Sequence, residues 1–546
     1  MSARPARVGA PALALALALA LALAMLAGSG HVLAGGQATE PAADAAPERD
    51  HAWLRDQVEA VVERYGLPGI AVGVIEGGEA TLLHTSGELV AGSGEPVTSR
   101  SLFKIASNSK AMTAAVLGRL VDAGKLAWDD PVIRHLPQFR MHDPWVTRHM
   151  QVRDLLIHNS GLPQGAGDLM LWPGPNDFTR ADIINALAHL RPERSFRSGY
   201  AYDNLLYVVA GEVAAAAGGA SYEELVRREV FEPLGLDRCQ VGAFDRDAVG
   251  DIAQPHMRQG GTHVAYALDP PQVPEITSAA AGGIRCGLED MLGWAKAWLD
   301  PGTAPDWLSA TQRQAMWTAH TPLPVPSRQH DWSRTRLRAY GYGWRLADLH
   351  GRWSVSHTGT LGGMYSVLHL LPDRDAGFVV MTNGSGDAAR TVLDQVLAEY
   401  LLGEGAGRDA MYYADALAAS AAARTASGRA PDVSVREPAP PQAMADWLGT
   451  WSDPWFGEVT VCPQEEGVEF RSARSPRLSG MVMDTALGRL VDWHADSVDA
   501  EAWLRLEQGE GGPVLRMAKV DPDADFSYDY EDLEFTRTGA CPVGGP

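Results

Sequence analysis

Residues 103–114 read Phe103-Lys104-Ile105-Ala106-Ser107-Asn108-Ser109-Lys110-Ala111-Met112-Thr113-Ala114 and contain a Ser-x-x-Lys pattern, Ser107 and Lys110. The apolar run that follows predicts a helix over residues 111–121. Side chains three residues apart share one face of a helix, so the lysine amine can reach the serine hydroxyl and take its proton. A second pair with the same spacing is Ser101 and Lys104, but here the serine precedes an extended apolar segment, residues 102–105. The helical context therefore favours Ser107 as a nucleophile and Lys110 as its partner.

Further motifs follow this segment in a fixed order. Tyr-x-Asn occurs at Tyr202-Asp203-Asn204, directly before a predicted helix, and His-x-Gly occurs at His357-Thr358-Gly359-Thr360. Three more blocks accompany them, LAWDDPV (126–132), VRDLLIHNSGLP (152–163) and AGGI (281–284). Together these motifs resemble the serine β-lactamase and penicillin-binding protein superfamily. The resemblance covers residues 50–405.

The resemblance implies a role for each catalytic residue. Ser107 would attack a carbonyl carbon and form an acyl-enzyme, with Lys110 or Tyr202 as the base. The lysine and the tyrosine should titrate as a unit, so the sequence does not assign the base to either one.

The remaining residues of the predicted site would bind the substrate. Asn204 would hydrogen-bond the acyl side-chain amide and the lysine. His357 would contact the tyrosine or a substrate carboxylate from an edge strand. Gly359 would let the substrate backbone approach that strand. The N–H groups of Thr360 and of the nucleophile would form an oxyanion hole.

The third motif departs from the pattern of most β-lactamases, which have lysine where this chain has His357. Histidine at this position is a feature of DD-carboxypeptidases, D-aminopeptidases and related esterases of the superfamily. The resemblance therefore implies a serine hydrolase that acts on amide or ester bonds of peptides containing D-amino acids, without a cofactor or a metal. An esterase or weak β-lactamase is the nearest alternative. An alternative of another class is a penicillin-binding sensor or scaffold with little turnover.

The coarse secondary-structure pattern predicts an α+β fold. Hydrophobic spacing predicts a helix near residues 54–65, a β-hairpin over 70–84, mostly helices from 107 to 300, and strands with a closing helix over 342–402. An antiparallel sheet would be assembled from both ends of this segment and flanked by helices, with a helical lobe inserted between the two ends. We assign the hydrolase domain to residues 51–403.

A second domain is expected near the C-terminus. Residues 404–440 are rich in Ala, Arg, Ser and Pro, which predicts a linker. Short β-like runs over 441–538 predict a small all-β barrel, and the segments 449–459 and 523–533 resemble a lipocalin-like module. All three catalytic motifs precede residue 361. We therefore expect separable domains, with the barrel tuning the hydrolase but taking no part in its chemistry.

The N-terminal sequence predicts export. Arg4 and Arg7 precede an Ala/Leu run over residues 10–27, and Val32-Leu33-Ala34 fits a cleavage site. Residues 1–34 therefore read as a signal peptide and residues 35–50 as a flexible leader. An uncleaved N-terminal anchor is the alternative. We expect a periplasmic or secreted protein without a membrane span after cleavage.

Composition narrows the choice of partners. A net charge of −22 without long runs of one sign disfavours nucleic acid, so the expected partner is a small-molecule or peptide substrate, and the oligomeric state stays open. Four cysteines in 546 residues are too few for a disulfide scaffold. Cys462 and Cys541 follow the first and last predicted barrel strands and can form a disulfide, with two free thiols as the alternative. Cys239 and Cys286 form a less supported second pair.

Overall fold

The hydrolase part of the molecule is built on an eight-stranded antiparallel sheet. The computed structural model of the chain describes residues 50–384 and 386–542, so the predicted signal peptide (1–34) and the leader (35–50), apart from Asp50, lie outside the described residues. The strand order is β2-β1-β14-β13-β12-β11-β10-β9. The bounds are β1 Gly69–Glu76, β2 Glu79–Gly87, β9 Thr321–Pro322, β10 Arg338–Tyr340, β11 Arg345–Leu349, β12 Arg352–Leu361, β13 Met364–Leu371 and β14 Ala376–Thr382. Because β1 pairs with β14, the sheet joins both ends of the segment, which confirms the predicted assembly.

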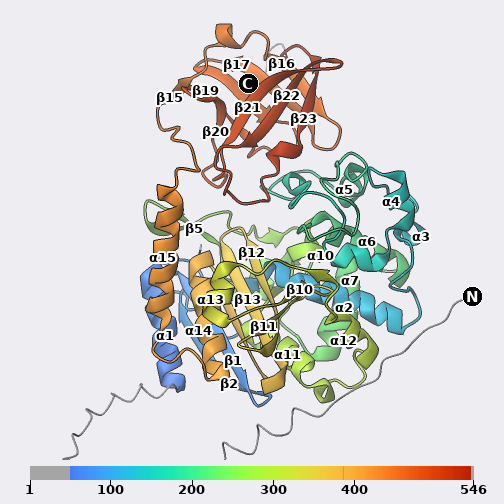
Figure 1. Cartoon of the computed structure of the whole chain (residues 1–546), viewed down its shortest axis with the longest axis vertical. Coiled ribbons are helices and arrows are strands. Elements are labelled where there is room, and N and C mark those ends of the chain that lie inside the picture. Colours follow the sequence, from blue (N-terminus) through green and yellow to red (C-terminus); the bar gives the residue numbers. More distant parts are fainter. Residues whose placement is uncertain (1–49, 385, 543–546) are drawn as a thin grey trace, which may run out of the picture. The chain divides into compact units, whose positions relative to one another are not determined.

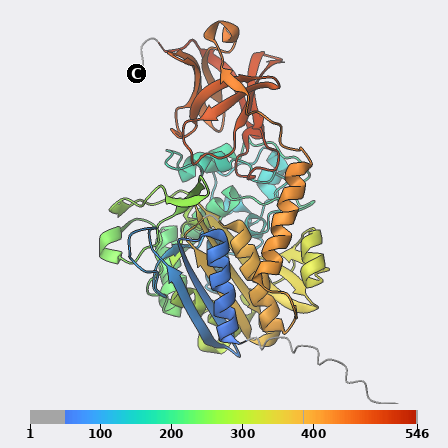
Figure 2. The same ribbon diagram turned by 90° about the vertical axis from the view of Figure 1, so that its left-hand side faces the viewer.

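Helices cover both faces of this sheet. Three of them, α1 (His51–Tyr65), α14 (Asp387–Leu402) and α15 (Ala410–Ala426), lie side by side in Figures 1 and 2. Side chains alternate along β1: Ile70 and Val72 pack into the core with these three helices, whereas Ala71 and Ile75 belong to the core on the opposite face. On that opposite face α11 (Leu288–Leu299) packs against β1 and β14. The predicted α+β fold is confirmed.

The predicted helical lobe lies between β2 and β9. Its centre is formed by α2 (Ser109–Asp122), α6 (Leu205–Gly218) and α10 (Ala279–Gly282), which contact one another. Besides α11, the other helices between β2 and β9 are α3 Val132–His135, α4 Pro144–His149, α5 Arg180–Ala186, α7 Tyr222–Val226, α8 Glu232–Leu234, α9 Arg246–Val249 and α12 Ala310–Met316, whereas α13 (Ser327–Ser333) lies between β9 and β10. Three strand pairs complete the lobe, β3 Phe103–Lys104 with β8 Arg285–Cys286, β4 Phe244–Asp245 with β7 Gln272–Val273, and β5 His256–Gln259 with β6 Thr262–Ala265. Of the helices described, none is by itself long and apolar enough to cross a membrane, and one bent pair, 205–218 with 222–234, passes by length and composition only.

The C-terminal domain is a closed eight-stranded barrel, as predicted. Its strands follow the order β19-β18-β17-β16-β23-β22-β21-β20, and β20 pairs with β19 to close it. Buried aromatic side chains, including those of Trp451, Phe470 and Phe535, fill its interior. The bounds are β16 Gly449–Asp453, β17 Gly457–Gln464, β18 Gly467–Ser472, β19 Ser479–Thr485, β20 Gly488–Trp493, β21 Ala502–Gly509, β22 Gly512–Lys519 and β23 Glu534–Gly539.

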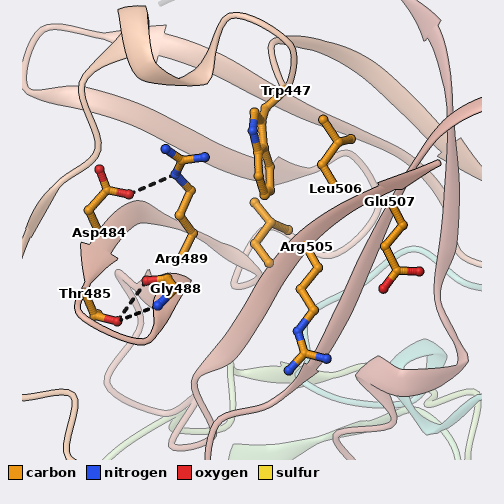
Figure 3. Close-up of a pocket in the computed structure, with 9 residues that line it drawn as sticks. Trp447, Asp484, Thr485, Gly488, Arg489, Arg505, Leu506 and Glu507 are labelled. Carbon is orange, nitrogen blue, oxygen red and sulfur yellow. Dashed lines mark hydrogen bonds and ion pairs between the residues drawn. The ribbon is translucent and has the colours of Figure 1, made fainter.

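A pocket of about 500 Å³ lies on the barrel, between the β19–β20 turn and β21 (Figure 3). Arg489 lines it, but its guanidinium is bonded to Asp484 at 2.8 Å and lies 4.9 Å from the centroid of the Trp447 ring. The Arg489 cation is therefore already paired, and a second arginine, Arg505, also lines the pocket. No residue of the predicted catalytic motifs lines the pocket.

The segment 404–440, expected to be a linker, contains two elements. The first is α15, which is fixed to the hydrolase domain: the Tyr413 hydroxyl donates to the buried carboxylate of Glu399 on α14, and the Ala410 N–H donates to Gln57 on α1 at 2.8 Å. The second is β15 (Arg436–Pro438), which pairs with β19 of the barrel. The chain between these two elements is residues 427–435.

Both cysteine pairs form disulfides. Cys462 on β17 is bonded to Cys541, with a Cα–Cα distance of 5.7 Å, and Cys239 is bonded to Cys286, with a distance of 4.2 Å. The predicted pairing is confirmed. The Cys239–Cys286 bond holds β8, which pairs with β3, the strand that leads into the Ser-x-x-Lys segment.

Removing the barrel disulfide should destabilise that domain. Cys462 and Cys541 are 79 residues apart, and closing a loop of this size lowers the entropy of the unfolded chain. The Cys462→Ser/Cys541→Ser variant should lose about 4 kcal/mol of the free energy of unfolding of the barrel in the chain-entropy model, measured by urea denaturation. A reductant should lower the urea concentration at which half of the wild-type barrel is unfolded, and it should leave that midpoint unchanged in the variant. Equal stability of the two proteins would contradict this expectation.

Candidate active site

The predicted nucleophile lies in a tight turn between a strand and a helix. Ser107 is the middle residue of a 3-10 turn, Ala106–Asn108, that follows β3 and leads directly into α2. Ala106 has a φ of 50°, in the left-handed region that non-glycine residues rarely adopt. The side-chain amide of Asn108 donates to the Ser366 hydroxyl on β13 at 2.8 Å and fixes the turn against the sheet. A strained backbone conformation of this kind is retained only where the surrounding structure holds it in place. Here the Asn108–Ser366 hydrogen bond does so.

Lys110 lies in the first turn of α2 and is fully buried, with 0% of its surface exposed. Its Nζ is 3.2 Å from Ser107 Oγ, as the helical spacing predicts. Nζ also donates to Asn204 Oδ1 and to the Ala281 carbonyl oxygen, both at 2.7 Å. Burial lowers the pKa of Lys110 to about 7, because the ammonium group loses its hydration. The neutral amine can keep both donated bonds and still offer its lone pair to the Ser107 proton.

Tyr202, the second predicted base, is held as a phenol. Burial raises its pKa to about 12, although the nearby charge of Arg345 and the Ser107 hydroxyl act to lower it. The Lys110 amine is 4.9 Å from the centroid of its ring, and the buried His158 ring is 4.3 Å away on centroids. Near pH 7 the lysine therefore titrates and the tyrosine does not. This geometry favours Lys110 as the base and Tyr202 as a proton donor, a choice that the sequence left open.

Asn204 connects the lysine to a buried carboxyl group that the sequence analysis missed. Its Oδ1 accepts from Lys110, and its Nδ2 donates to Asp168 Oδ2 at 2.9 Å. Asp168 is fully buried, and burial raises its pKa well above the usual range. The carboxyl group fixes which way the amide points, so the amide oxygen faces the lysine. Among the described residues no group of three His, Cys, Asp or Glu is arranged to hold a metal ion.

His357 is enclosed by the protein, with 0% of its surface exposed. Its Nε2 accepts from the Tyr340 hydroxyl at 2.8 Å, and its Nδ1 donates to the Thr358 carbonyl oxygen at 2.7 Å. Burial lowers its pKa well below the usual range, so the ring is neutral at pH 7. No ring nitrogen is left for the substrate carboxylate that we expected it to contact. Its strand β12 is an inner strand of the sheet, although β11 pairs with it only as far as Ser356.

Gly359 and Thr360 lie on the part of β12 that faces the nucleophile turn. A Cβ on Gly359 would collide with the Ile105 carbonyl oxygen and the Ser366 hydroxyl. The nucleophile turn therefore requires a glycine at this position. We had expected the glycine to make room for the substrate backbone instead. Arg390 donates to the Gly359 carbonyl at 2.6 Å and to Thr360 Oγ1 at 2.9 Å, which fixes this segment. The Thr360 N–H as an oxyanion donor stays a prediction.

Arg345 is a second residue that the sequence analysis missed. It begins β11, donates to Thr358 Oγ1 at 2.7 Å, and its guanidinium carbon is 5.9 Å from the centroid of the Tyr202 ring. The groups that act on its charge most strongly are tyrosines, including Tyr200, and it forms no ion pair with a carboxylate in the described part of the chain. An arginine keeps its charge at any working pH. The site therefore presents beside Tyr202 a cation that no carboxylate pairs among the described residues.

The pH dependence of acylation should follow Lys110. The amine must be deprotonated to act as a base, so acylation should reach a plateau above pH 7 and fall about tenfold per pH unit well below it. The alkaline side should stay flat up to the titration of Tyr202 near pH 12. The measurement is the burst of p-nitrophenol from an acyl ester between pH 5 and 9. Burial also raises the pKa of Asp203 to about 7, so Asp203→Asn is the control and should leave the acid limb in place.

Comparisons with known proteins indicate one family. The family model described as Beta-lactamase matches residues 54–402. Penicillin-binding protein 4 of Amycolatopsis lactamdurans is 31% identical over 362 residues, which are 66% of this chain and 91% of that protein. The protein named Unguisins hydrolase ungD' of Aspergillus campestris is 28% identical over 363 residues, which are 63% of this chain and 63% of that protein. The chain thus spans nearly all of the first relative and less than two thirds of the second.

A solved structure shares the fold. The octameric penicillin-binding protein homologue from Pyrococcus abyssi superposes with a TM-score of 0.58 over 86% of this chain and 98% of that chain. The two sequences are 18% identical, so this likeness concerns the fold alone.

Proposed function

The chain belongs to the beta-lactamase family of serine hydrolases, and we propose that it is an exported enzyme that cleaves amide or ester bonds through an acyl-enzyme on Ser107. The observation that carries this proposal is the buried Lys110 amine, with its pKa lowered to about 7, at 3.2 Å from the Ser107 hydroxyl. An adjacent neutral base is what converts a weakly nucleophilic serine into a reactive one. Export rests on residues 1–34, as the sequence predicts.

In the proposed acylation, Ser107 Oγ bonds to the substrate carbonyl carbon while Lys110 takes its proton. The carbonyl oxygen becomes an oxyanion, for which the N–H groups of Ser107 and Thr360 are the predicted donors. When the bond to the leaving group breaks, Tyr202 donates its phenolic proton to that group and regains one from Lys110. Water then attacks the acyl carbon and loses a proton to the Lys110 amine, and the resulting ammonium group returns a proton to Ser107 Oγ as the acyl–oxygen bond breaks.

The substrate class follows from Arg345. A neutral, enclosed His357 cannot hold a carboxylate, whereas the unneutralised guanidinium beside Tyr202 can bind one in a bidentate manner. We therefore favour peptides with a free C-terminal carboxylate, which makes a carboxypeptidase-like reaction the best-supported form of the activity. The preference for D-amino acids comes from the sequence resemblance. The relative named as an unguisins hydrolase supports hydrolytic turnover.

Replacing Arg345 should slow the hydrolysis of peptides with a C-terminal carboxylate more than that of peptides with an uncharged C-terminus. Arg345→Ala should lower kcat/KM for peptidyl-D-Ala-D-Ala by about ten- to a hundredfold, the worth of a charge-assisted hydrogen bond. The same peptide with a C-terminal amide is the matched control and should be processed equally by both proteins. Arg345→Lys should recover part of the loss, since lysine keeps the charge but not the planar fork. Equal losses on both peptides would assign Arg345 a purely structural role.

A penicillin-binding sensor remains the candidate of another class, since both a relative and a structural neighbour are named as penicillin-binding proteins. A fluorescent penicillin would label Ser107 in an enzyme and in a sensor alike. Only the enzyme would show multiple turnovers on a D-alanyl peptide, a D-aminoacyl amide, nitrocefin or a p-nitrophenyl ester. Mass spectrometry of the trapped adduct would place the acyl group on Ser107, and an unlabelled Ser107 would refute the proposal.

A further inference from the structure

A loop of the barrel reaches the hydrolase domain beside the catalytic residues. It comprises residues 521–529, between β22 and the short turn Tyr530–Asp532. At its end, the Asp529 carboxylate accepts the backbone N–H groups of Gly167 and Leu169, at 2.6 and 2.9 Å. Asp529 is buried there. Because these two amides flank Asp168, the loop is fixed at the residue that orients Asn204.

The same loop extends the hydrogen-bond network of the catalytic lysine. Ser527 Oγ donates to Asp168 Oδ2 at 2.8 Å, the oxygen that also accepts from Asn204 at 2.9 Å. Asn204 in turn accepts from Lys110 at 2.7 Å. The other oxygen of Asp168, Oδ1, is buried without a hydrogen-bond partner among the described residues. The barrel hydroxyl and the Asn204 amide are thus the two donors that hold this carboxyl group.

Phe526 packs directly on Tyr202. Their rings meet edge to face, with centroids 5.7 Å apart and planes inclined at 73°. The Phe526 backbone lies against Gly165, where a Cβ would come within 2.6 Å of its carbonyl oxygen. Gly165 itself donates its N–H to the Tyr202 carbonyl at 2.8 Å. Phe526 as a whole is only half-buried, whereas Tyr202 is buried.

A second contact holds the barrel on the same lobe. Arg474, which follows β18, is bonded to Asp177 at 2.7 Å and to Asp182 at 2.8 Å. Its guanidinium lies 4.2 Å from the centroid of the Phe178 ring, and Phe178 packs on Phe456 of the barrel at 5.7 Å. The barrel is thus held on the lobe at two separate places, one through the loop 521–529 and one through Arg474 and Phe456.

We propose that the barrel loop 521–529 completes the active site, with Phe526 limiting the size of the acyl group beside Tyr202 and Asn204, and Ser527 positioning Asn204 on Lys110 through Asp168. The inference rests on the proposed acyl-enzyme function. It replaces the expectation that the barrel takes no part in the chemistry: Phe526 is a specificity-determining residue and Ser527 a positioning residue. Neither is visible in the catalytic motifs, all of which precede residue 361.

The test uses the full chain and two esters that differ by one phenyl group, p-nitrophenyl acetate and p-nitrophenyl phenylacetate. The readout is the pre-steady-state burst, which reports acylation of Ser107 even if turnover is slow. Phe526→Ala should raise the ratio of the phenylacetate rate to the acetate rate by about tenfold, with Phe526→Leu between the two and Phe526→Trp below wild type. A ratio within twofold of wild type across the folded variants would overturn the specificity role. If the alanine variant does not fold, the Phe526→Leu and Phe526→Trp variants still test the proposal, because their rate ratios should lie above and below that of the wild type.

Ser527→Ala should behave differently from the Phe526 series. Loss of the hydroxyl loosens Asp168 and Asn204, so both esters should be acylated about tenfold more slowly, with their ratio unchanged, and Ser527→Thr should restore both rates. Wild-type rates in Ser527→Ala would overturn the positioning role. A wild-type protein that releases no p-nitrophenol from either ester would instead refute the proposed function. The two failures are therefore distinguishable.

Discussion

Replacing Ser107 by alanine should abolish acylation. The Oγ atom is the bond-forming atom in the proposed reaction, and it is the hydroxyl that the Lys110 amine contacts, at 3.2 Å. Removal of a catalytic nucleophile costs on the order of 10⁴-fold or more in rate. Ser107→Ala should therefore show no burst with p-nitrophenyl acetate and no covalent mass increase after incubation with a penicillin or a fluorophosphonate.

The matched control is Ser101, the serine of the second Ser-x-x-Lys pair. Its hydroxyl donates to Asp251 and accepts the Thr98 N–H at 2.8 Å, so it holds a loop of the lobe. Ser101→Ala should keep the burst, with at most a modest loss of stability. Intact labelling of the Ser107→Ala protein would refute the site assignment. Labelling lost from Ser101→Ala alone would transfer the assignment to the first pair.

Lys110→Met should lower the acylation rate by on the order of a hundredfold or more, as loss of a general base does. Methionine has a similar volume, so the change removes the amine while filling the space in the core. The acid limb of the pH profile near pH 7 should disappear with the amine, because the group that titrates there is gone. Burst kinetics between pH 5 and 9 measure both effects in one experiment. A retained limb with an unchanged rate would exclude Lys110 as the base.

Lys104 provides a closely matched control for this experiment. It is the lysine of the other Ser-x-x-Lys pair, and burial lowers its pKa as well, to about 8. It lies on β3 beside Arg285, outside the hydrogen-bond network of Ser107. Lys104→Met should keep the acid limb and the rate of the wild type. That outcome would show that a lowered lysine pKa does not by itself give activity, and that the position next to the nucleophile does.

Much of the catalytic centre was predictable because its spacing is local. Ser107 and Lys110 are three residues apart across a 3-10 turn and the first turn of α2, and Tyr202 and Asn204 stand two residues apart directly before α6, so short motifs report their geometry. The pairing of β1 with β14 was predictable for another reason: strand patterns at both ends of the domain leave few ways to build one sheet. The structure confirms the sheet, the lobe and the barrel, and it brings Ser107, Lys110, Tyr202 and Asn204 together.

What the sequence could not show depends on burial and on distant segments. Whether His357 is charged is decided by its enclosure and by the Tyr340 hydroxyl, which no motif reports. Arg345 is a single arginine at the start of a short strand, with no pattern around it. Phe526 and Ser527 come from another domain, more than 300 residues after Tyr202, and only the docked barrel places them beside it.

The pairing of β1 with β14 also bears on how the protein is made. Synthesis runs from the N-terminus, so β1 and β2 emerge long before β14, which begins at Ala376. Until then the nascent chain carries an open strand edge bordered by Ile70, Val72 and Val74, a row of apolar β-branched side chains that attracts other unfolded chains. Ribosomes that stall before residue 382 would release such chains with the edge still open. Until β14 pairs with it, this strand edge should therefore be one of the segments that a holding chaperone covers.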